Sequence, residues 1–274
     1  MPELAAGPHR GAVLSIAALL ILLEALWLRL RGGTPYDWRE TGVSALVMAG
    51  QFVSRVPAAL VIAPVMLWVY RHRLFEIQTR GAVALAGLFI GAEFLYYWFH
   101  RLSHRVRWLW ATHAVHHSST RLNLSAAVRL GWTGALSGGW LLFTPLVWIG
   151  YPPPAVTGML AANLTFQFLL HTELLPRLGP LEWVFNTPSH HRVHHAANAD
   201  LLDRNFGGVL IVFDRLFGTH ADEPRDMPLR YGWASGPPAT KPIAIAFGEW
   251  RRIFGELAHC ASAHDVWGAV VGRR

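Results

Sequence analysis

Long apolar segments recur along the first two thirds of the chain, and they constrain its fold more than any other feature of the sequence. Several approach the length of about 20 residues that an α-helix needs to cross a hydrocarbon layer. So many apolar segments in one chain of 274 residues are hard to bury in a soluble domain. We therefore expect an all-α, multi-pass integral membrane helix bundle. The apolar segments are 11–28, 43–70, 82–99, 132–149 and 155–170.

The charge of the chain indicates a membrane surface as its partner, and no nucleic acid. The formal net charge is +7 with neutral histidines, and almost all of the basic residues are arginines. No basic block alternates with aromatic residues as in a nucleic-acid-binding module. Basic loops beside anionic lipid head groups account for this balance. Cys260 is the single cysteine, which excludes a disulfide framework and a cysteine metal site.

Consecutive prolines at 152–154 predict a tight turn, because proline cannot continue a helix. Segments 132–149 and 155–170 are then expected to form a hairpin that enters the membrane and returns. Residues 100–130 and everything after residue 171 would share one face of the membrane. The many arginines of that face predict that it is cytoplasmic, in a bacterial inner membrane.

Three regions are expected along the chain: N-terminal membrane helices (1–80), a catalytic domain (81–220) and a C-terminal cytosolic tail (221–274). The topology of residues 41–80 stays open, because arginines interrupt and follow the apolar run. This region is either a simple span or a bent, partial insertion. The apolar segment 209–213 is too short to be assigned as a strand or a helix. Glu24 lies inside the first apolar run without an assignable role.

Histidines carry the chemical signal of the sequence. Ten of the 15 histidines fall in four clusters at helix ends and in polar segments. Spacings of three and four residues recur in these clusters and place side chains on one face of a helix. Ten imidazoles near a membrane have no plausible structural purpose in common, so the clusters predict metal binding. They are His100 and His104; His113, His116 and His117; His171; and His190, His191, His194 and His195.

The number and type of these ligands favour two metal ions. Imidazole is a ligand for iron, zinc, copper and nickel. Structural zinc takes four ligands and commonly includes cysteine. Nine or ten histidines are too many for one ion, whereas two ions with four or five nitrogens each account for them. Such a site is highly positive and needs nearby carboxylates or bound oxygen species.

Three further residues are candidates for hydrogen bonds to the outer nitrogens of the histidines. Glu93 precedes the first cluster by two helical turns, on the same stripe of the helix. Asp203 and Asn205 follow the last cluster closely. Alternatively, Glu93 pairs with an arginine and the other two residues form a turn. His190 lies outside the shared helix face, so it binds metal or contacts substrate. The isolated histidines are expected to be ordinary residues: His9, His72, His220, His259 and His264.

The order of these motifs resembles the fatty acid hydroxylase superfamily, also called the sterol desaturase family. The resemblance extends from Glu93 to His220, and the stretches 166–195 and 203–220 are especially similar to the alkylglycerol monooxygenase-like branch and its bacterial relatives. It rests on HRLSH (100–104), HAVHH (113–117), His171, NTPSHHRVHH (186–195) and DRNFGGVLIVFDRLFGTH (203–220). The resemblance implies a cytosolic helical cap that holds a non-haem di-iron centre. The implied ligands are His100, His104, His113, His116, His117, His171, His191, His194 and His195, with His190 as a further candidate.

The expected activity follows from that resemblance. Members of the superfamily hydroxylate or desaturate lipids, so we expect O2-dependent hydroxylation of a lipid C–H bond, with desaturation as the alternative. The electrons would come from a separate reductase or small redox protein, because no G-x-G-x-x-G motif follows a strand. A membrane metal carrier or sensor is an alternative of another class, which the location of the clusters on one face disfavours. A zinc hydrolase would need a His-Glu-x-x-His string, which the sequence lacks.

Overall fold

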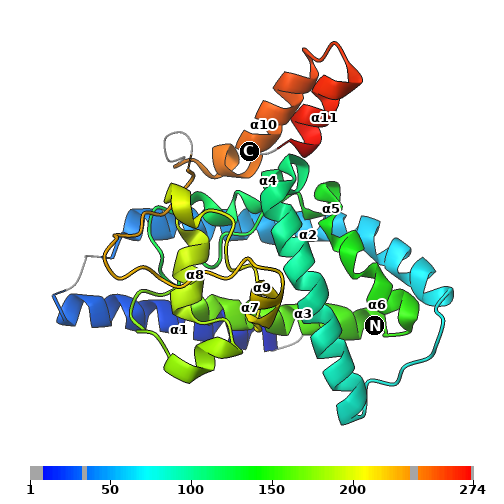
Figure 1. The fold of residues 1–274 in the computed structure, drawn as a ribbon, viewed down its shortest axis with the longest axis horizontal. Coiled ribbons are helices and arrows are strands. Elements are labelled where there is room, and N and C mark those ends of the chain that lie inside the picture. The colour runs from blue at the N-terminus through cyan, green and yellow to red at the C-terminus, as the bar shows by residue number, and fades with distance from the viewer. Residues whose placement is uncertain (1–8, 33–35, 235–239, 273–274) are drawn as a thin grey trace.

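The computed structural model describes residues 9–32, 36–234 and 240–272 (Figure 1). Within these ranges the chain is built of helices and loops. Extended backbone pairs there only in two isolated bridges, Phe185–Leu210 and Ala196–Tyr231. The predicted all-α class is therefore confirmed for the described part of the chain.

Among the described residues, three helices are long and apolar enough to cross a membrane: α1 (His9–Leu30), α2 (Trp38–Arg71) and α3 (Ala82–Arg105). Large apolar side chains on these helices face outward, and Val53 and Leu60 of α2 are each 74% exposed. Apolar surface of this extent is unfavourable in water and is expected against lipid. The expectation of a membrane helix bundle is therefore confirmed.

Helix α2 forms most of the region 41–80, whose membrane topology the sequence leaves open. It is one helix of 34 residues, with Pro57 and Pro64 inside it, and a loop follows from residue 72. Asp37 caps its start by accepting a hydrogen bond from the backbone N–H of Glu40. At about 1.5 Å per residue, the helix exceeds a hydrocarbon layer of about 30 Å. A helix of this length that crosses such a layer tilts in it or extends beyond it.

The predicted hairpin of two long helices is wrong in its first arm. Residues 132–149 form three short pieces: α5 (Gly134–Ser137), the 3-10 helix η2 (Gly139–Phe143) and α6 (Thr144–Ile149). Gly138 ends α5 with a left-handed φ of 72°, which breaks the helix. The next residue, Gly139, approaches α3 so closely that an added Cβ would lie 2.6 Å from the Phe99 ring.

The predicted turn at residues 150–154 is confirmed. Helix α6 ends at Ile149, Gly150 has a φ of 138°, and α7 (Pro153–Leu170) begins within the prolines. Proline suits the first turn of a helix because the N–H that it lacks would be unpaired there. In Figure 1, α3 crosses the view steeply, whereas α1, α2 and α7 run along its long axis. The main apolar core joins α2, α3, η2, α6 and α7 through Met66, Leu88, Ala92, Tyr96, Phe143, Leu146, Val147, Tyr151 and Val156.

Shorter helices cover one end of this core. They are α4 (Arg107–His113), η1 (His116–Ser118), η3 (Gly179–Trp183), α8 (Pro188–His195), η4 (Ala199–Leu201) and α9 (Val212–Leu216). The segment 209–213 is neither one strand nor one helix, because Leu210 forms an isolated bridge and α9 starts at Val212. Helices α10 (Pro242–Leu257) and α11 (Ala263–Val271) pack on one another, and Trp250 of α10 packs against Ala111 of α4 (Figure 1).

Candidate metal centre

Nine of the ten clustered histidines gather in two groups. Within each group, one ring nitrogen from every residue lies within 4.8 Å of the others. All nine are buried except His113, which is partly exposed. The five-histidine group is His100, His104, His113, His117 and His194, and the four-histidine group is His116, His171, His191 and His195.

Two of the sequence motifs divide between the groups. His113 and His117 join the five-histidine group, whereas His116 joins the other. The prediction that these three share one face of a helix is wrong, because α4 ends at His113 and η1 begins at His116. In α8, likewise, His194 belongs to the five-histidine group, and the other two histidines of its motif belong to the four-histidine group. The groups are therefore adjacent, and the rings of His117 and His195 stack with centroids 4.3 Å apart.

Backbone carbonyls orient four of the rings. Because a carbonyl oxygen can only accept, each Nδ1 facing one must carry the proton, and a neutral ring then has a bare lone pair on Nε2. That lone pair is directed into the group. The pairs are His100 with Phe206 O (2.8 Å), His116 with Arg129 O (3.2 Å), His171 with Gln167 O (2.7 Å) and His194 with Arg204 O (2.9 Å).

The relation between His116 and His171 tests whether these residues fit a metal. Their Nε2 atoms lie 3.2 Å apart, although both carry lone pairs and neither has a proton to donate. Burial lowers the pKa of His116 to about 4 and that of His171 well below its usual value, so protonation does not relieve the contact at neutral pH. His194 Nε2 is also buried, without a hydrogen-bond partner in the described structure. A cation bound in the four-histidine group would satisfy His116 and His171, and a cation in the five-histidine group would satisfy His194, so the residues fit a metal centre.

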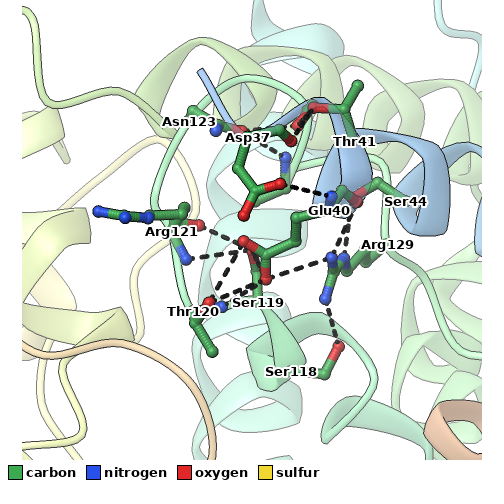
Figure 2. A network of polar contacts seen from close by, with 12 residues as sticks. Asp37, Glu40, Thr41, Ser44, Ser118, Ser119, Thr120, Arg121, Asn123 and Arg129 are labelled. Atoms are coloured by element: carbon green, nitrogen blue, oxygen red, sulfur yellow. Dashed lines mark hydrogen bonds and ion pairs between the residues drawn. The ribbon is translucent and has the colours of Figure 1, made fainter. Parts of the chain in front are cut away.

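A buried arginine network holds the carbonyl that orients His116 (Figure 2). Arg129 is 1% exposed, and its guanidinium donates hydrogen bonds to Ser44 Oγ, Ser118 Oγ and the backbone oxygen of Glu40. It also lies 3.4 Å from the Glu40 carboxylate. The start of α2 is thereby tied to the loop after η1. Sequence reasoning missed Arg129, because the group that meets the histidine is a backbone oxygen, which any residue supplies.

Of the three predicted hydrogen-bond partners, Asp203 lies against a histidine ring. Its Oδ1 is 3.7 Å from His104 Nδ1, and its Oδ2 is 3.4 Å from Arg105 Nε. Asn205 instead forms hydrogen bonds with the backbone, because its amide donates to His190 O and Ala221 O. Both Asp203 and Asn205 adopt positive φ, of 60° and 55°, so the turn proposed as their alternative role is also present.

Glu93 contacts neither a histidine ring nor an arginine through the hydrogen bonds of its carboxylate. Its oxygens accept from Asn163 Nδ2 and from the backbone N–H groups of Val209 and Leu210. It thereby joins α3 to α7 and to the loop before α9.

His190 lies apart from both groups. Its Nε2 is 3.4 Å from Nε2 of His220, and these two residues form a third set of possible ligands with Asp222. The expectation that His220 has no cluster partner is therefore wrong. His72 and His259 face carbonyls of the helices that precede them, as expected of ordinary residues, and His264 is exposed. The His9 side chain lies outside the described residues.

A cavity of about 340 Å³ opens beside the metal centre. His113, His116 and His171 line it, so it reaches both histidine groups. Most of the remaining wall is apolar, from α3, α4, α5, α7 and the loop before α5, and it includes Phe99, Leu164 and Phe168. An apolar space beside these imidazoles suits a hydrocarbon chain.

Comparison with known proteins gives related sequences. Alkylglycerol monooxygenase of Homo sapiens is 36% identical over 239 residues, which cover 85% of this chain and 51% of that protein. Alkylglycerol monooxygenase of Danio rerio is 40% identical over 211 residues, covering 74% and 46%. An ornithine lipid hydroxylase of Rhizobium tropici is 29% identical over 216 residues, covering 78% and 65%. The chain thus spans about half the length of the alkylglycerol monooxygenases that it matches. No solved structure matches it.

The family match covers the metal centre itself. Residues 85–219 match the family model described as fatty acid hydroxylase. This segment contains all nine histidines of the two groups. Through it, the chain belongs to the fatty acid hydroxylase family.

Proposed function

We propose that the chain is a membrane-bound, di-iron lipid hydroxylase that uses O2 and electrons from outside the chain. The observation that carries the proposal is the opposition of the unprotonated His116 and His171 Nε2 atoms within one of two adjacent histidine groups beside an apolar cavity. A single ion cannot account for nine imidazoles, so each group is proposed to hold one ion. His190 is proposed to lie outside the ligand set.

Ligand number supports iron over tetrahedral zinc. Five imidazoles exceed the four ligands of a structural zinc site. In the five-histidine group, His113 Nε2 lies 3.0 Å from His100 Nε2 and 3.2 Å from His117 Nε2. Two nitrogens bound at about 2.1 Å are about 3.0 Å apart when they subtend a right angle at the ion, and about 3.4 Å apart in a tetrahedron. Both distances suit two nitrogens on one ion, and five imidazoles favour a coordination number above four, which iron accepts.

The proposed reaction consumes one O2, two electrons and two protons, and converts a C–H bond to C–OH with release of water. The metal pair, when bound, supplies the O2 activation. The described part of the chain orients the imidazoles through backbone carbonyls and excludes water by burial of the rings. The electron donor is proposed to be a separate reductase or small redox protein.

A lipid substrate is supported by the cavity and by the relatives. The cavity wall includes residues of α3, one of the three helices long enough to span a membrane, so a lipid tail would enter from the hydrocarbon layer. The named relatives are hydroxylases or monooxygenases of lipids. We further propose residues 81–220 as the catalytic unit between the membrane helices of 1–80 and the tail of 221–274. Its metal centre would lie on the cytoplasmic face of a bacterial inner membrane.

The test uses the full chain in lipid nanodiscs with a reductase, a total lipid extract and isotopically labelled O2. Mass spectrometry should find a lipid that has gained one labelled oxygen atom. A lipid that has only lost two hydrogens would instead indicate desaturation. Metal binding without O2 consumption would indicate a carrier or sensor. The variant His194→Ala should abolish the product. His259→Ala is the matched control, because His259 is an exposed histidine that follows α10.

A further inference from the structure

Four polar side chains form a buried chain of hydrogen bonds that ends at the cavity wall. Tyr96 Oη donates to Gln167 Oε1 at 3.1 Å. Gln167 Nε2 donates to Asn163 Oδ1 at 2.5 Å, and Asn163 Nδ2 donates to Glu93 Oε1 at 2.5 Å. None of the four residues is more than 6% exposed. We refer to these residues as the relay.

With Glu93 ionised, the direction of every bond in the relay is fixed at its carboxylate. Its Oε2 accepts the backbone N–H groups of Val209 at 2.7 Å and Leu210 at 2.9 Å, and a backbone N–H can only donate. With the carboxylate as acceptor, Asn163 must turn its NH2 toward it and its oxygen toward Gln167. The amide of Gln167 is oriented in the same way, because each amide has one donating and one accepting end. The relay therefore directs the Tyr96 proton toward Gln167.

The end of the relay lies beside the metal centre. Tyr96 and Gln167 line the same cavity as His113, His116 and His171. The Tyr96 ring also lies 5.4 Å from the ring of His100, measured between centroids. Since its one proton is already donated to Gln167, the Tyr96 oxygen can only accept a further hydrogen bond.

We propose that Tyr96 is a specificity-determining residue that accepts a hydrogen bond from the substrate. The site then selects a lipid that carries a hydroxyl group within a few bonds of the attacked carbon. This inference rests on the proposed function, because it takes the cavity as the substrate site. A relay that served only to join α3 to α7 would not distinguish between lipids with and without a hydroxyl group.

The size of the expected discrimination follows from burial. A substrate with a donor satisfies the buried oxygen, whereas one without a donor displaces water from it and leaves it unpaired. One such hydrogen bond corresponds to a difference of about tenfold in affinity.

The test compares two probe lipids, a 1-O-alkylglycerol and the same molecule with both hydroxyl groups methylated. Binding is measured to the metal-loaded full chain in nanodiscs, without O2 or reductant. The unaltered chain should bind the free hydroxyl form about tenfold more tightly. Tyr96→Phe should reduce this ratio to about one. Tyr151→Phe is the matched control, because Tyr151 Oη donates to Ala84 O outside the cavity lining, and it should keep the ratio.

A second variant reverses the relay without removing the tyrosine. In Glu93→Gln the side-chain oxygen still accepts the two backbone N–H groups, and its new NH2 now donates to Asn163. Both amides then turn over, Gln167 donates to the Tyr96 oxygen, and the Tyr96 proton points into the cavity. The methylated probe, whose ether oxygens can accept this proton, should bind more tightly than it does to the unaltered chain. The ratio should fall to about one while the iron content is unchanged.

The outcomes separate this inference from the function on which it rests. Equal binding of both probes by the unaltered chain would overturn the inference, and this comparison needs no variant to fold. A preference that survives Tyr96→Phe would also overturn it. Selective binding without any oxidised product would support the role of Tyr96 in substrate selection and contradict the proposed hydroxylase activity. Turnover of both probes with equal affinity would support the hydroxylase activity and contradict the role of Tyr96.

Discussion

The carboxylate of Glu24, inside the apolar helix α1, accepts a hydrogen bond of 2.6 Å from Thr172 Oγ1. Thr172 directly follows His171 of the four-histidine group. The same carboxylate accepts the backbone N–H of Leu124 at 2.8 Å and the hydroxyl of Tyr36 at 3.3 Å. Glu24 is 4% exposed, so this acidic residue of an apolar helix fastens α1 to two segments that follow metal-centre histidines.

Replacement of Glu24 should destabilise the protein and loosen this side of the site. Glu24→Ala leaves the Leu124 N–H and the Thr172 hydroxyl without their acceptor, which we expect to lower the free energy of unfolding by about 2–4 kcal/mol. Thermal unfolding in detergent and iron content per chain are the measurements, and both should fall. Glu76→Ala, at an exposed glutamate paired with Arg73, is the control. Unfolding midpoints that coincide for the two variants would contradict the assigned role.

Arg129 should be among the most sensitive residues outside the histidines. Arg129→Met removes the cation beside the Glu40 carboxylate and the donor to the Ser44 and Ser118 hydroxyls, and breaking a buried charge pair typically costs about 3–5 kcal/mol. The loop carrying the carbonyl partner of His116 would then lose its anchor on α2. Arg121→Met makes the same chemical change at an exposed arginine of that loop and should be nearly neutral. Similar thermal stability of the two variants would count against the network in Figure 2.

Asp214 gives the protein a pH-dependent stability. Burial raises its pKa to about 6, although it accepts hydrogen bonds from Thr219 Oγ1 and from the backbone N–H groups of Phe206 and Gly207. The folded chain thus binds the Asp214 proton more tightly than the unfolded chain, whose pKa is about 3.9. The resulting stabilisation is complete below about pH 4 and is lost as the pH rises through about 6, a change of about 3 kcal/mol.

Asp214→Asn should remove this dependence. Unfolding midpoints of the unaltered chain and the variant, measured between pH 4 and pH 7, should converge as the pH rises because only the unaltered chain loses stability through this group. A constant difference across that range would show that Asp214 titrates alike in the folded and unfolded states.

Gly208 should tolerate no side chain. A Cβ at this position would lie 2.0 Å from Asn163 Nδ2, inside the relay. Gly208→Ala should therefore destabilise the protein by about 1–3 kcal/mol through overpacking. Gly158→Ala is the control, since it lies in α7 with nothing within 4 Å of the added Cβ, and alanine favours a helix. Loss of thermal stability by the Gly158 variant and not by the Gly208 variant would refute this packing.

Much of the architecture could be predicted from apolar runs and histidine spacing. The runs predicted the membrane helices, and α1, α2 and α3 agree with them. The failure at 132–149 has a local cause, because the break at Gly138 depends on a left-handed backbone and on close packing of Gly139 against Phe99. Hydropathy contains no information about the backbone conformation of Gly138 or the packing of Gly139.

The candidate site was predictable as a set of residues and not as an arrangement. Spacing alone brought His113, His116 and His117 together, whereas the structure sends His116 to the other group because the helix ends after His113. The backbone acceptors of the rings, such as Arg129 O, have no sequence signature. Glu24 also stayed unexplained, since its partners lie 100 and 148 residues away in the chain.

The metal content of the purified full chain tests the central claim most directly. Elemental analysis of protein in nanodiscs, expressed with sufficient iron, should give two iron ions per chain, one for each histidine group. A single zinc ion per chain, or no bound metal at all, would contradict the two-ion centre and with it the proposed oxygen chemistry.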